Sequence, residues 1–291
     1  MIDATMGEGG HCYAFASRYP DLSILGIDAD SAIQAVGRER LAEFGSRVRF
    51  HAGWAQDFFA AYPDGLKRPN TILSDFGISM FHYKQSGRGF SFSADEALDM
   101  RLDTSRGVSA AELLTRMPDG EIADTLYRNA GERYSRRIAR AIVRERQRGS
   151  IATSAALTEL IERAVPASYR HGAIHPATRT FMALRIEVNG ELSRLPDLLE
   201  NMLEVLEPGG RLGVISFHAL EDKIVKNFFR MKNRYCTCPP HAPSCTCGGK
   251  RKVTILTRKG VTAGEEEIRR NPPSRSARLR VAEKIMEADI Q

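Results

Sequence analysis

Long uncharged hydrophobic runs are missing from this sequence, and cysteine and tryptophan are scarce. No stretch approaches the roughly 18 apolar residues that mark a membrane-spanning helix, so we expect no membrane association. The residues after Met1 show no basic run and apolar core of the kind found in a secretory signal. A chain of 291 residues with five cysteines does not depend on disulfides to fold, which favours a reducing, cytoplasmic compartment.

The overall composition is that of a soluble globular protein. Hydrophobic residues make up 42% of the chain and charged residues 27%, which excludes a mainly disordered protein. The length suits one large domain or two modest ones. The net charge of +6 is small for the length, so its distribution along the chain decides what it means.

Short apolar strands alternate with helical patterns at the start of the chain and again near its end. Strands are expected at 1–4, 22–27, 48–51, 70–75, 211–217, 253–258 and 277–282, and helices at 11–19, 29–44, 184–206 and 220–229. Such alternation predicts a parallel sheet with crossover helices. From about 93 to 176 the pattern is helical. We therefore expect an α/β domain, formed by residues 1–90 and 185–291, that is interrupted by a helical insert at 91–184.

A glycine-rich turn follows the first strand. Asp3 precedes the run Gly7-Glu8-Gly9-Gly10, and Asp28 ends the second strand. Glycines let the backbone approach a ligand closely, and an acid at the end of the second strand accepts hydrogen bonds from ribose hydroxyls. The run does not continue as the G-x-G-x-x-G of dinucleotide sites, which favours S-adenosylmethionine over a dinucleotide. An ordinary tight turn is the alternative.

Asp75 ends another apolar strand, in the run Ser-Asp-Phe-Gly-Ile-Ser. Open α/β sheets bind ligands at the carboxyl ends of their strands, where this side chain would lie. Its carboxylate could accept a hydrogen bond from the cofactor adenine or from the methyl acceptor, or could cap a turn. Asp75 is therefore the candidate catalytic residue.

Eight distinctive runs occur in one order along essentially the whole chain. They are DATMGEGGH, DFGIS, RGFSF, LDMRLD, GERYSRRIARAIV, HPATRTFMALRIEVNGEL, GGRLGVISFHALEDKIVKNFF and RNPPSRSARLRVAEK. Together they closely resemble the bacterial 16S ribosomal RNA cytosine N4-methyltransferase family. The resemblance implies a Rossmann-like class I methyltransferase sheet with an inserted all-helical recognition domain. It also implies S-adenosyl-L-methionine as methyl donor.

The resemblance also implies a set of cofactor contacts. These are Gly9, Gly10, His11, Asp28, Trp54, Ala55, Asp75 and His82. Two of the regions depart from the family pattern. The aromatic residue that the family has near the end of the third strand is displaced here, and Trp54 and Ala55 occupy that region. His82 stands where the family has a glutamine. Trp54 is suited to stack on adenine, and filling the core is its other interpretation.

Positive charge is concentrated in the expected insert. Residues 128–148 contain eight arginines and two glutamates, so this stretch carries as much net charge as the whole chain. The candidate RNA-binding residues, which recur every three or four positions, are Arg133, Arg136, Arg137, Arg140 and Arg144. Arginine grips phosphate and stacks on bases, which favours an RNA surface over a solvated helix face.

Two groups of potential metal ligands are weighed and not assigned to catalysis. Cys236, Cys238, Cys245 and Cys247 could hold Zn²⁺, but their C-x-C spacing is a weaker signal than C-x₂-C, and reduced cysteines or a labile disulfide are the alternatives. His171 and His175 are interrupted by Gly172 and Pro176, so a loop or RNA-contacting role is favoured. Methyl transfer from a sulfonium requires no metal.

The sequence thus predicts methyl transfer from S-adenosyl-L-methionine to the exocyclic N4 of a cytidine in 16S rRNA. By resemblance, this cytidine lies in the decoding region of the small ribosomal subunit. The alternatives are a non-catalytic RNA-binding assembly factor and a dinucleotide-dependent oxidoreductase.

Overall fold

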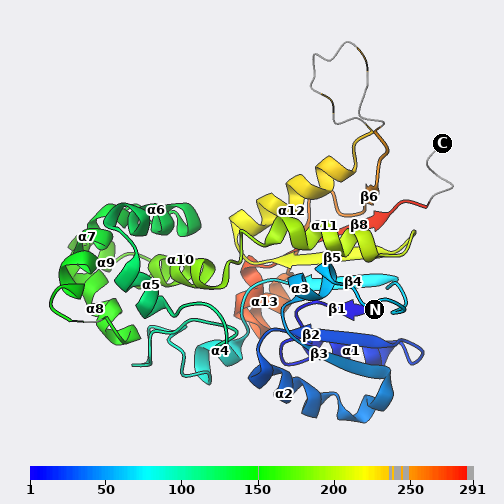
Figure 1. Cartoon of the computed structure of the whole chain (residues 1–291), viewed down its shortest axis with the longest axis horizontal. Helices are drawn as coiled ribbons and strands as arrows, with labels where there is room; N and C mark the ends of the chain where they lie inside the picture. The colour runs from blue at the N-terminus through cyan, green and yellow to red at the C-terminus, as the bar shows by residue number, and fades with distance from the viewer. Residues whose placement is uncertain (150, 236–237, 239–243, 245–248, 287–291) are drawn as a thin grey trace. The chain divides into compact units, whose positions relative to one another are not determined.

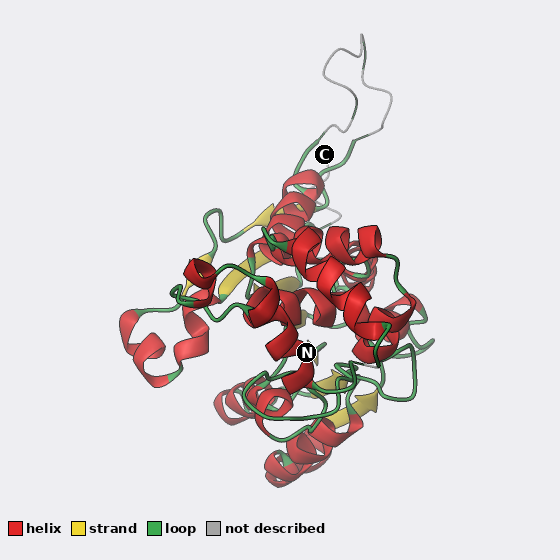
Figure 2. Cartoon of the chain, turned by 90° about the vertical axis from the view of Figure 1, so that its left-hand side faces the viewer, coloured by secondary structure: helices red, strands yellow, loops and turns green. Residues whose placement is uncertain are grey.

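The computed structural model describes residues 1–149, 151–235, 238, 244 and 249–286. These residues form two compact units, one made of 1–77 and 193–291 and the other of 78–192. Most of the regular structure is helical, and the strands belong to a single sheet (Figure 2). No helix among the described residues is long and apolar enough to cross a membrane.

The first unit contains an eight-stranded sheet. Its strands are β1 (Ile2–Asp3), β2 (Ile24–Asp28), β3 (Val48–Ala52), β4 (Thr71–Asp75), β5 (Arg211–Ser216), β6 (Val253–Ile255), β7 (Val261–Thr262) and β8 (Arg278–Lys284). They are ordered β3-β2-β1-β4-β5-β8-β6, with β7 paired to β8. The first five are parallel, and β8 runs antiparallel between β5 and β6. This confirms the predicted Rossmann-like α/β sheet.

Helices cover both faces of this sheet (Figure 1). They are α1 (Gly10–Arg18), α2 (Ser31–Arg40), α3 (Ala55–Ala60), α11 (Leu195–Val205) and α12 (Ala219–Lys232). The exposed α13 (Glu265–Arg270) and short 3₁₀ turns at Ala42–Arg47 and Pro272–Ser276 also belong to this unit. Alternate residues of β2 separate the two layers. Ile24 packs with α1 and the end of α2, while Ile27 faces α3, α11 and α12. Burial of both faces explains why the inner strands β2 and β5 are largely apolar, whereas the edge strand β3 contains Arg49 and His51.

The second unit is built around a core of its own. Its helices are α4 (Met80–Lys84), α5 (Ala110–Arg116), α6 (Asp119–Ala130), α7 (Ser135–Arg146), α8 (Ser154–Ala164), α9 (Ala167–Arg170) and α10 (Ala177–Asn189). Its hydrophobic core cluster comes from residues 90–184, and Leu126, Ile138 and Leu157 are completely buried within it. Outside these helices, the one β-bridge described in this unit pairs Ala97 with Thr153.

The boundaries of the units differ from the expected 90 and 184. The structure places them at 77 and 192, because α4 and the segment carrying Phe90 pack with the helical core, as does the whole of α10. The continuous helix predicted over 184–206 is wrong. Gly190 ends α10 in a left-handed conformation with φ of 60°, and Pro196 lies in the first turn of α11.

Other differences are smaller. The helix expected over 29–44 ends at Arg40 and continues as a 3₁₀ turn, and the strand expected over 253–258 stops at Ile255. Sequence reasoning missed β7 and α13, which are short and largely exposed and so carry no hydrophobic pattern.

Candidate functional site

The strand order reverses between β1 and β4. The chain adds β2 and β3 on one side of β1, then returns to place β4 and β5 on the other side. Open α/β sheets bind ligands in the crevice outside the carboxyl ends of the strands at such a switch point. Asp3, Asp28 and Asp75 are the last residues of β1, β2 and β4, so three acids lie along this edge.

The turn between β1 and α1 requires glycine at one position. Gly9 is the N-cap of α1 with φ of 78°, a left-handed conformation that favours glycine. A Cβ at this position would lie 2.7 Å from the Leu41 side chain. The chain therefore passes close to the end of α2 and begins α1 at Gly10 without a side chain over the turn.

Asp28 holds the glycine turn through its side chain. One carboxylate oxygen accepts a hydrogen bond from the Gly7 N–H at 2.7 Å, and the other accepts from the Asp30 N–H at 2.9 Å. The Asp28 carbonyl accepts from the Gly53 N–H at 2.8 Å, just before Trp54. Asp28 thus joins the two predicted cofactor segments that follow β1 and β3.

Asp3 is completely buried beneath the turn. Its carboxylate accepts hydrogen bonds from the Thr5 N–H and the Cys12 thiol, both at 3.2 Å. Burial raises the pKa of Asp3 to about 6 and raises the pKa of the Cys12 thiol, so the thiol stays protonated and can donate. Sequence reasoning assigned no role to Cys12, whose hydrogen bond to Asp3 fixes α1 to β1.

Asp75 and His11 face each other across the switch point. The His11 Nε2 donates to one Asp75 carboxylate oxygen at 3.1 Å, and this hydrogen bond raises the pKa of His11. The Asp75 N–H donates to the Thr5 hydroxyl at 2.6 Å. Thr5 was missed by sequence reasoning, although it stands in the same run as Asp3 and the glycines. It ties the β1 turn to the end of β4.

The other Asp75 oxygen, Oδ1, is buried and has no hydrogen-bond partner among the described residues. Buried polar atoms are almost always paired, so an orphaned carboxylate oxygen at a ligand-binding edge indicates a missing donor. A nucleoside amine is a donor of the right kind. This oxygen is the observation by which the site fits a cofactor such as S-adenosylmethionine.

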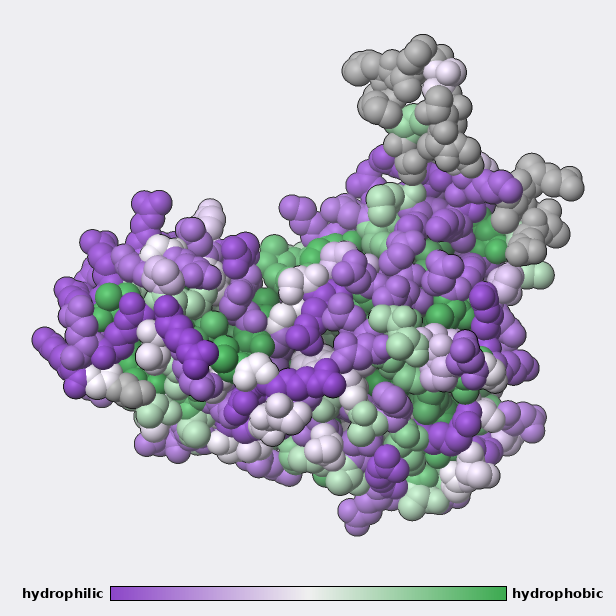
Figure 3. Space-filling model, viewed as in Figure 1, coloured by the Kyte–Doolittle hydropathy of each residue, from purple (hydrophilic) through white to green (hydrophobic). Residues whose placement is uncertain are grey.

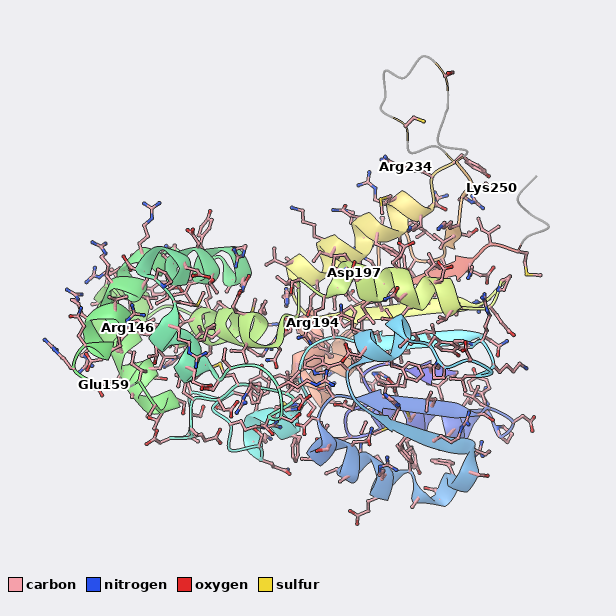
Figure 4. All side chains as sticks on the ribbon, viewed as in Figure 1. Arg146, Glu159, Arg194, Asp197, Arg234 and Lys250 are labelled. Carbon is pink, nitrogen blue, oxygen red and sulfur yellow. The ribbon has the colours of Figure 1, made fainter. Side chains whose placement is uncertain are left out.

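Trp54 and Ala55 begin the helix after β3. Trp54 is the N-cap residue of α3 and half-buried, and Ala55 packs against the core as the first residue of that helix. The Arg194 guanidinium lies over the Trp54 ring, 4.6 Å from its centroid. Arg194 is labelled in Figure 4, just ahead of α11. It was not singled out from the sequence, because no spacing rule connects residues so far apart.

His82 belongs to the helical unit. Its ring is buried, caps α4 by accepting from the Ser79 N–H at 3.2 Å, and packs edge-on against Phe90. These contacts give His82 a structural role within its own unit.

The predicted RNA-binding arginines lie on and just before α7. Arg133, Arg136, Arg137, Arg140 and Arg144 are all exposed, while Ile138 and Ile142 on the opposite face are buried. Arg133 lies over the rings of Tyr134 and Tyr169, at 5.0 and 4.9 Å. Asp119 lines a shallow depression with Arg140 and Arg144 but makes no ion pair with either among the described contacts.

Three further arginines of the same run have carbonyl or carboxylate partners within the protein. Arg146 donates to the carbonyls of Leu114 and Met117 at the end of α5, and its place in the helical unit is labelled in Figure 4. Arg128 pairs with Glu187 at 3.3 Å, and Arg148 with Glu145 at 4.0 Å. The structure thus separates five arginines that have no described carboxylate partner from three that pair with a carboxylate or with the end of α5.

The histidines and cysteines weighed as metal ligands do not come together as a described site. His175 stacks on Phe92 and approaches Glu162 at 3.3 Å, whereas His171 ends α9. Cys236, Cys245 and Cys247 lie outside the described residues, so zinc binding by this cluster stays a hypothesis.

Comparison with known proteins gives one consistent result. The model of the MraW methylase family matches residues 1–285. A protein of Treponema denticola named ribosomal RNA small subunit methyltransferase H is 55% identical over 285 residues, which cover 98% of this chain and 90% of that protein. Proteins of the same name from Treponema pallidum and Citrifermentans bemidjiense are 42% and 44% identical, again over 98% of this chain and over 83% and 92% of their own lengths.

Proposed function

The chain belongs to the MraW methylase family and is a methyltransferase, and we propose that it methylates the exocyclic N4 of a cytidine in 16S rRNA. The proposed donor is S-adenosyl-L-methionine. The names of the relatives support ribosomal RNA of the small subunit as the substrate, and the choice of a decoding-region cytidine and of its N4 rests on the sequence resemblance. Such a substrate makes the cytoplasm the proposed location.

One observation carries the proposal: the buried, unpartnered Oδ1 of Asp75 at the switch point of the sheet. We propose that this oxygen accepts the adenine amine of the donor. The His11 hydrogen bond and the Thr5 hydroxyl hold the Asp75 carboxyl group and backbone, so the acceptor is oriented before the ligand arrives. An acceptor that is already oriented loses little conformational entropy when the ligand binds.

The other proposed contacts follow the same edge. The turn at Gly9 and Gly10 admits the donor's amino-acid part beside the backbone, and Asp28 accepts from the ribose hydroxyls. Trp54 stacks on the adenine, with Ala55 beside it, and His11 completes the proposed set in this unit. The resemblance adds His82, which belongs to the helical unit. The same Asp28 carboxylate that holds the Gly7 N–H would thus touch the ligand, which links cofactor affinity to the shape of the turn.

The donor, when bound, supplies an activated methyl group on sulfur. The protein's work is then mainly to position the two reactants, because effective concentration and orientation account for much of the barrier in such a transfer. The cytidine amino group needs an acceptor for its hydrogens, so that its lone pair points at the methyl carbon. Asp75 is the proposed residue for this role if its Oδ1 is not taken by the adenine, and the two roles differ in their kinetic signatures.

We assign RNA binding to the five arginines on and just before α7. Arg133, Arg136, Arg137, Arg140 and Arg144 present positive charge without carboxylate partners, which suits a phosphate backbone. Phosphate contacts orient a nucleic acid without reading its sequence. The choice of base is therefore left to other parts of the protein.

The test is direct. Purified protein is incubated with small-subunit RNA from a strain lacking this activity and with labelled S-adenosylmethionine, and the nucleosides are separated by mass spectrometry. We expect N4-methylcytidine at one position. A methyl group on the ring carbon C5, which generally requires a cysteine nucleophile, would contradict the proposal. RNA binding without any transfer would favour the assembly-factor alternative, and binding of NAD without adenosylhomocysteine would favour the oxidoreductase.

A further inference from the structure

The helix α12 carries a stripe of positive charge in the methyltransferase unit itself. Lys223, Lys226 and Arg230 are exposed along the helix, and Arg234 follows two residues after its end. At about 100° per residue, Lys223, Lys226 and Arg230 fall within roughly 60° of one another, on one face that extends about 10 Å along the helix axis. Arg234 lies beyond the end of the helix and continues the run of positive charge along the chain. We call these four residues the α12 stripe.

No ion pair is described for any member of the α12 stripe. The acids of this helix, Glu221 and Asp222, are both in its first turn. The Lys226 charge acts on Asp222 without a described ion pair, and both acids have closer partners. Asp222 pairs with Arg280 at 2.7 Å and with Arg278 at 3.4 Å, while the buried Glu221 accepts from the Phe217 N–H. The nearby Glu200 is taken by Lys232, at 2.6 Å.

Stabilisation of the helix itself does not explain the stripe. Cations favour the C-terminal turn of a helix, where the helix dipole is negative, and this accounts for Arg230. Lys223 lies in the second turn, near the positive end of the dipole, where a cation gains nothing. The stripe therefore contains charge that the helix does not need.

Other helices of this unit that expose several charged side chains differ from α12. On α2, Arg38, Glu39 and Arg40 mix the two signs, and α11 exposes the acids Asp197 and Glu204. Hydrophilic side chains cover much of the surface in Figure 3, so the distinctive property of α12 is its single sign of charge and not its polarity.

An exposed aromatic residue extends the same surface. Tyr235, 69% exposed, directly follows Arg234, and the Arg251 guanidinium lies 5.5 Å from the centre of its ring. Arg234 and Lys250, labelled in Figure 4, flank residues 236–248 in the sequence. Basic groups beside an exposed aromatic ring are the combination that binds phosphates and stacks on bases in single-stranded nucleic acid.

We propose that the α12 stripe, together with Tyr235, is a second RNA-binding surface that contacts the phosphate backbone of the substrate RNA independently of α7. The inference rests on the proposed function for the identity of that RNA. The helix begins three residues after β5, whose carboxyl end belongs to the same sheet edge as Asp75. RNA held along α12 therefore runs toward the ligand-binding edge within this unit.

The test compares two double variants that each remove two positive charges. Lys226→Gln/Arg230→Gln changes the stripe. Arg18→Gln/Arg49→Gln changes two exposed arginines at the end of α1 and on β3, away from α12 in the sheet. The affinity for transcribed 16S rRNA is measured at several salt concentrations, and circular dichroism melting checks that each variant folds.

Each phosphate contact contributes about 0.7–0.9 to the slope of log affinity against log salt. We expect the stripe variant to lose about 1.4–1.8 from this slope, whereas the control keeps the wild-type slope. Calorimetric affinity for S-adenosylmethionine should be the same in all three proteins. An unchanged slope in the stripe variant, or an equal loss in the control, overturns the proposal. If Lys226→Gln/Arg230→Gln melts early, Lys223→Gln/Arg234→Gln replaces it under the same criteria.

This outcome is separable from failure of the proposed function. If the wild type forms N4-methylcytidine and the stripe variant keeps its salt slope, the second surface is wrong and the function stands. If the wild type modifies a different atom or base while the stripe variant loses slope, the function is wrong and the surface stands. An unchanged RNA affinity with lost binding of an acidic protein would assign the stripe to a protein partner instead.

Discussion

The carboxyl edge of the sheet and the exposed face of α7 use charge in opposite ways. At the edge, Asp3 and Asp28 are held by backbone N–H groups and by a buried thiol. On α7, Arg136, Arg137 and Arg144 have no carboxylate partner among the described contacts. The acid side chains are oriented before any ligand binds, whereas the arginine side chains are not fixed by a carboxylate.

The two arrangements of charge suit different ligands. A charge fixed by several hydrogen bonds selects a ligand by position, so its removal has a large and specific effect. A set of free charges attracts phosphates at many positions, so its effect is graded and screened by salt. Substitutions at the edge should therefore have larger effects than substitutions on α7.

Asp75→Ala tests the edge most severely. We expect turnover to fall by at least about a hundredfold, because the change removes both the His11 partner and the unpartnered Oδ1, each the equivalent of about 1.5–3 kcal/mol. Folding, checked by thermal melting, should survive. Turnover within a few-fold of the wild type would contradict the placement of Asp75 at the reacting centre.

The same variant separates the two roles of Asp75. If its Oδ1 accepts the adenine amine, S-adenosylmethionine binding weakens in the absence of RNA. If it holds the cytidine amine, cofactor affinity is kept and only the chemical step slows. We expect the first result by calorimetry. Asp75→Asn serves as the matched variant of the same shape without the charge.

The buried Asp3 should make the free energy of unfolding depend on pH. Burial raises its pKa from 3.8 to about 6, so the folded state binds more protons than the unfolded state between these values. The stability from Asp3 is fully present below pH 3.8 and is lost as the pH rises through about 6. Asp3→Asn removes this dependence. The free energy of unfolding of the variant, relative to wild type, should therefore rise by about 2 kcal/mol from about pH 4.5 to 7.5.

Chemical denaturation at both pH values measures this difference. The exposed Asp21→Asn is the control, and its stability relative to wild type should not change with pH in this way. A constant difference between Asp3→Asn and wild type would mean that Asp3 is not kept protonated by burial.

Asp28→Ala should weaken S-adenosylmethionine binding at least about tenfold, since a hydrogen bond to a charged acceptor contributes about 1.5–3 kcal/mol. The structure adds that this variant also loses the acceptors of Gly7 and Asp30, so its melting temperature should fall as well. Asp28→Asn keeps one carbonyl acceptor and should lose less stability. Unchanged cofactor affinity in both variants would exclude Asp28 from the site.

On the arginine side, Arg136→Gln, Arg140→Gln and Arg144→Gln are combined. We expect about tenfold weaker RNA binding at moderate salt and a salt slope lower by about 2–3, with cofactor affinity unchanged. Arg146→Gln is the contrasting variant from the same helix. It should lower the melting temperature, because it frees two carbonyls at the end of α5, and leave the salt slope unchanged. Equal slopes in all proteins would reduce the α7 face to a solvated surface.

The smallest effect is expected at Arg194. A cation–π contact at an exposed site contributes about 0.5–1 kcal/mol, so Arg194→Gln should weaken cofactor binding about two- to fivefold. Trp54 is the only tryptophan of the chain, so its fluorescence reports the change directly. Arg194→Lys should restore part of the affinity. A fluorescence change without any loss of affinity would argue against stacking of Trp54 on the adenine.

Local signals in the sequence predicted the parallel strands and the residues at their ends. Asp28 and Asp75 follow continuous apolar runs, and the edge on which they meet follows from parallel pairing alone. The antiparallel β8 pairs with β5 across more than sixty residues of chain, and no local pattern encodes that pairing. The break at Gly190 was missed because the apolar spacing of α10 continues in register into α11, although the glycine itself was visible.

Within the site, the sequence identified the acids but not what holds them. Thr5, Cys12 and Arg194 act through contacts that depend on the folded geometry, since each reaches a partner on another element. The sorting of the arginines was equally hidden. Arg144 and Arg146 are two residues apart in one charged run, yet one is free and the other closes the end of α5.

The position of the insert within the chain also determines the order in which the two hydrophobic cores can form during synthesis. When synthesis reaches Leu192, the helical unit has its entire hydrophobic core, drawn from residues 90–184. The sheet at that moment has only β1 to β4, and it still lacks α11, α12 and β5, which supply most of the core on one of its faces. Domains tend to fold as units as the chain emerges. The helical unit can therefore fold before the sheet unit, whose N-terminal part needs residues from 193 onward to complete its core.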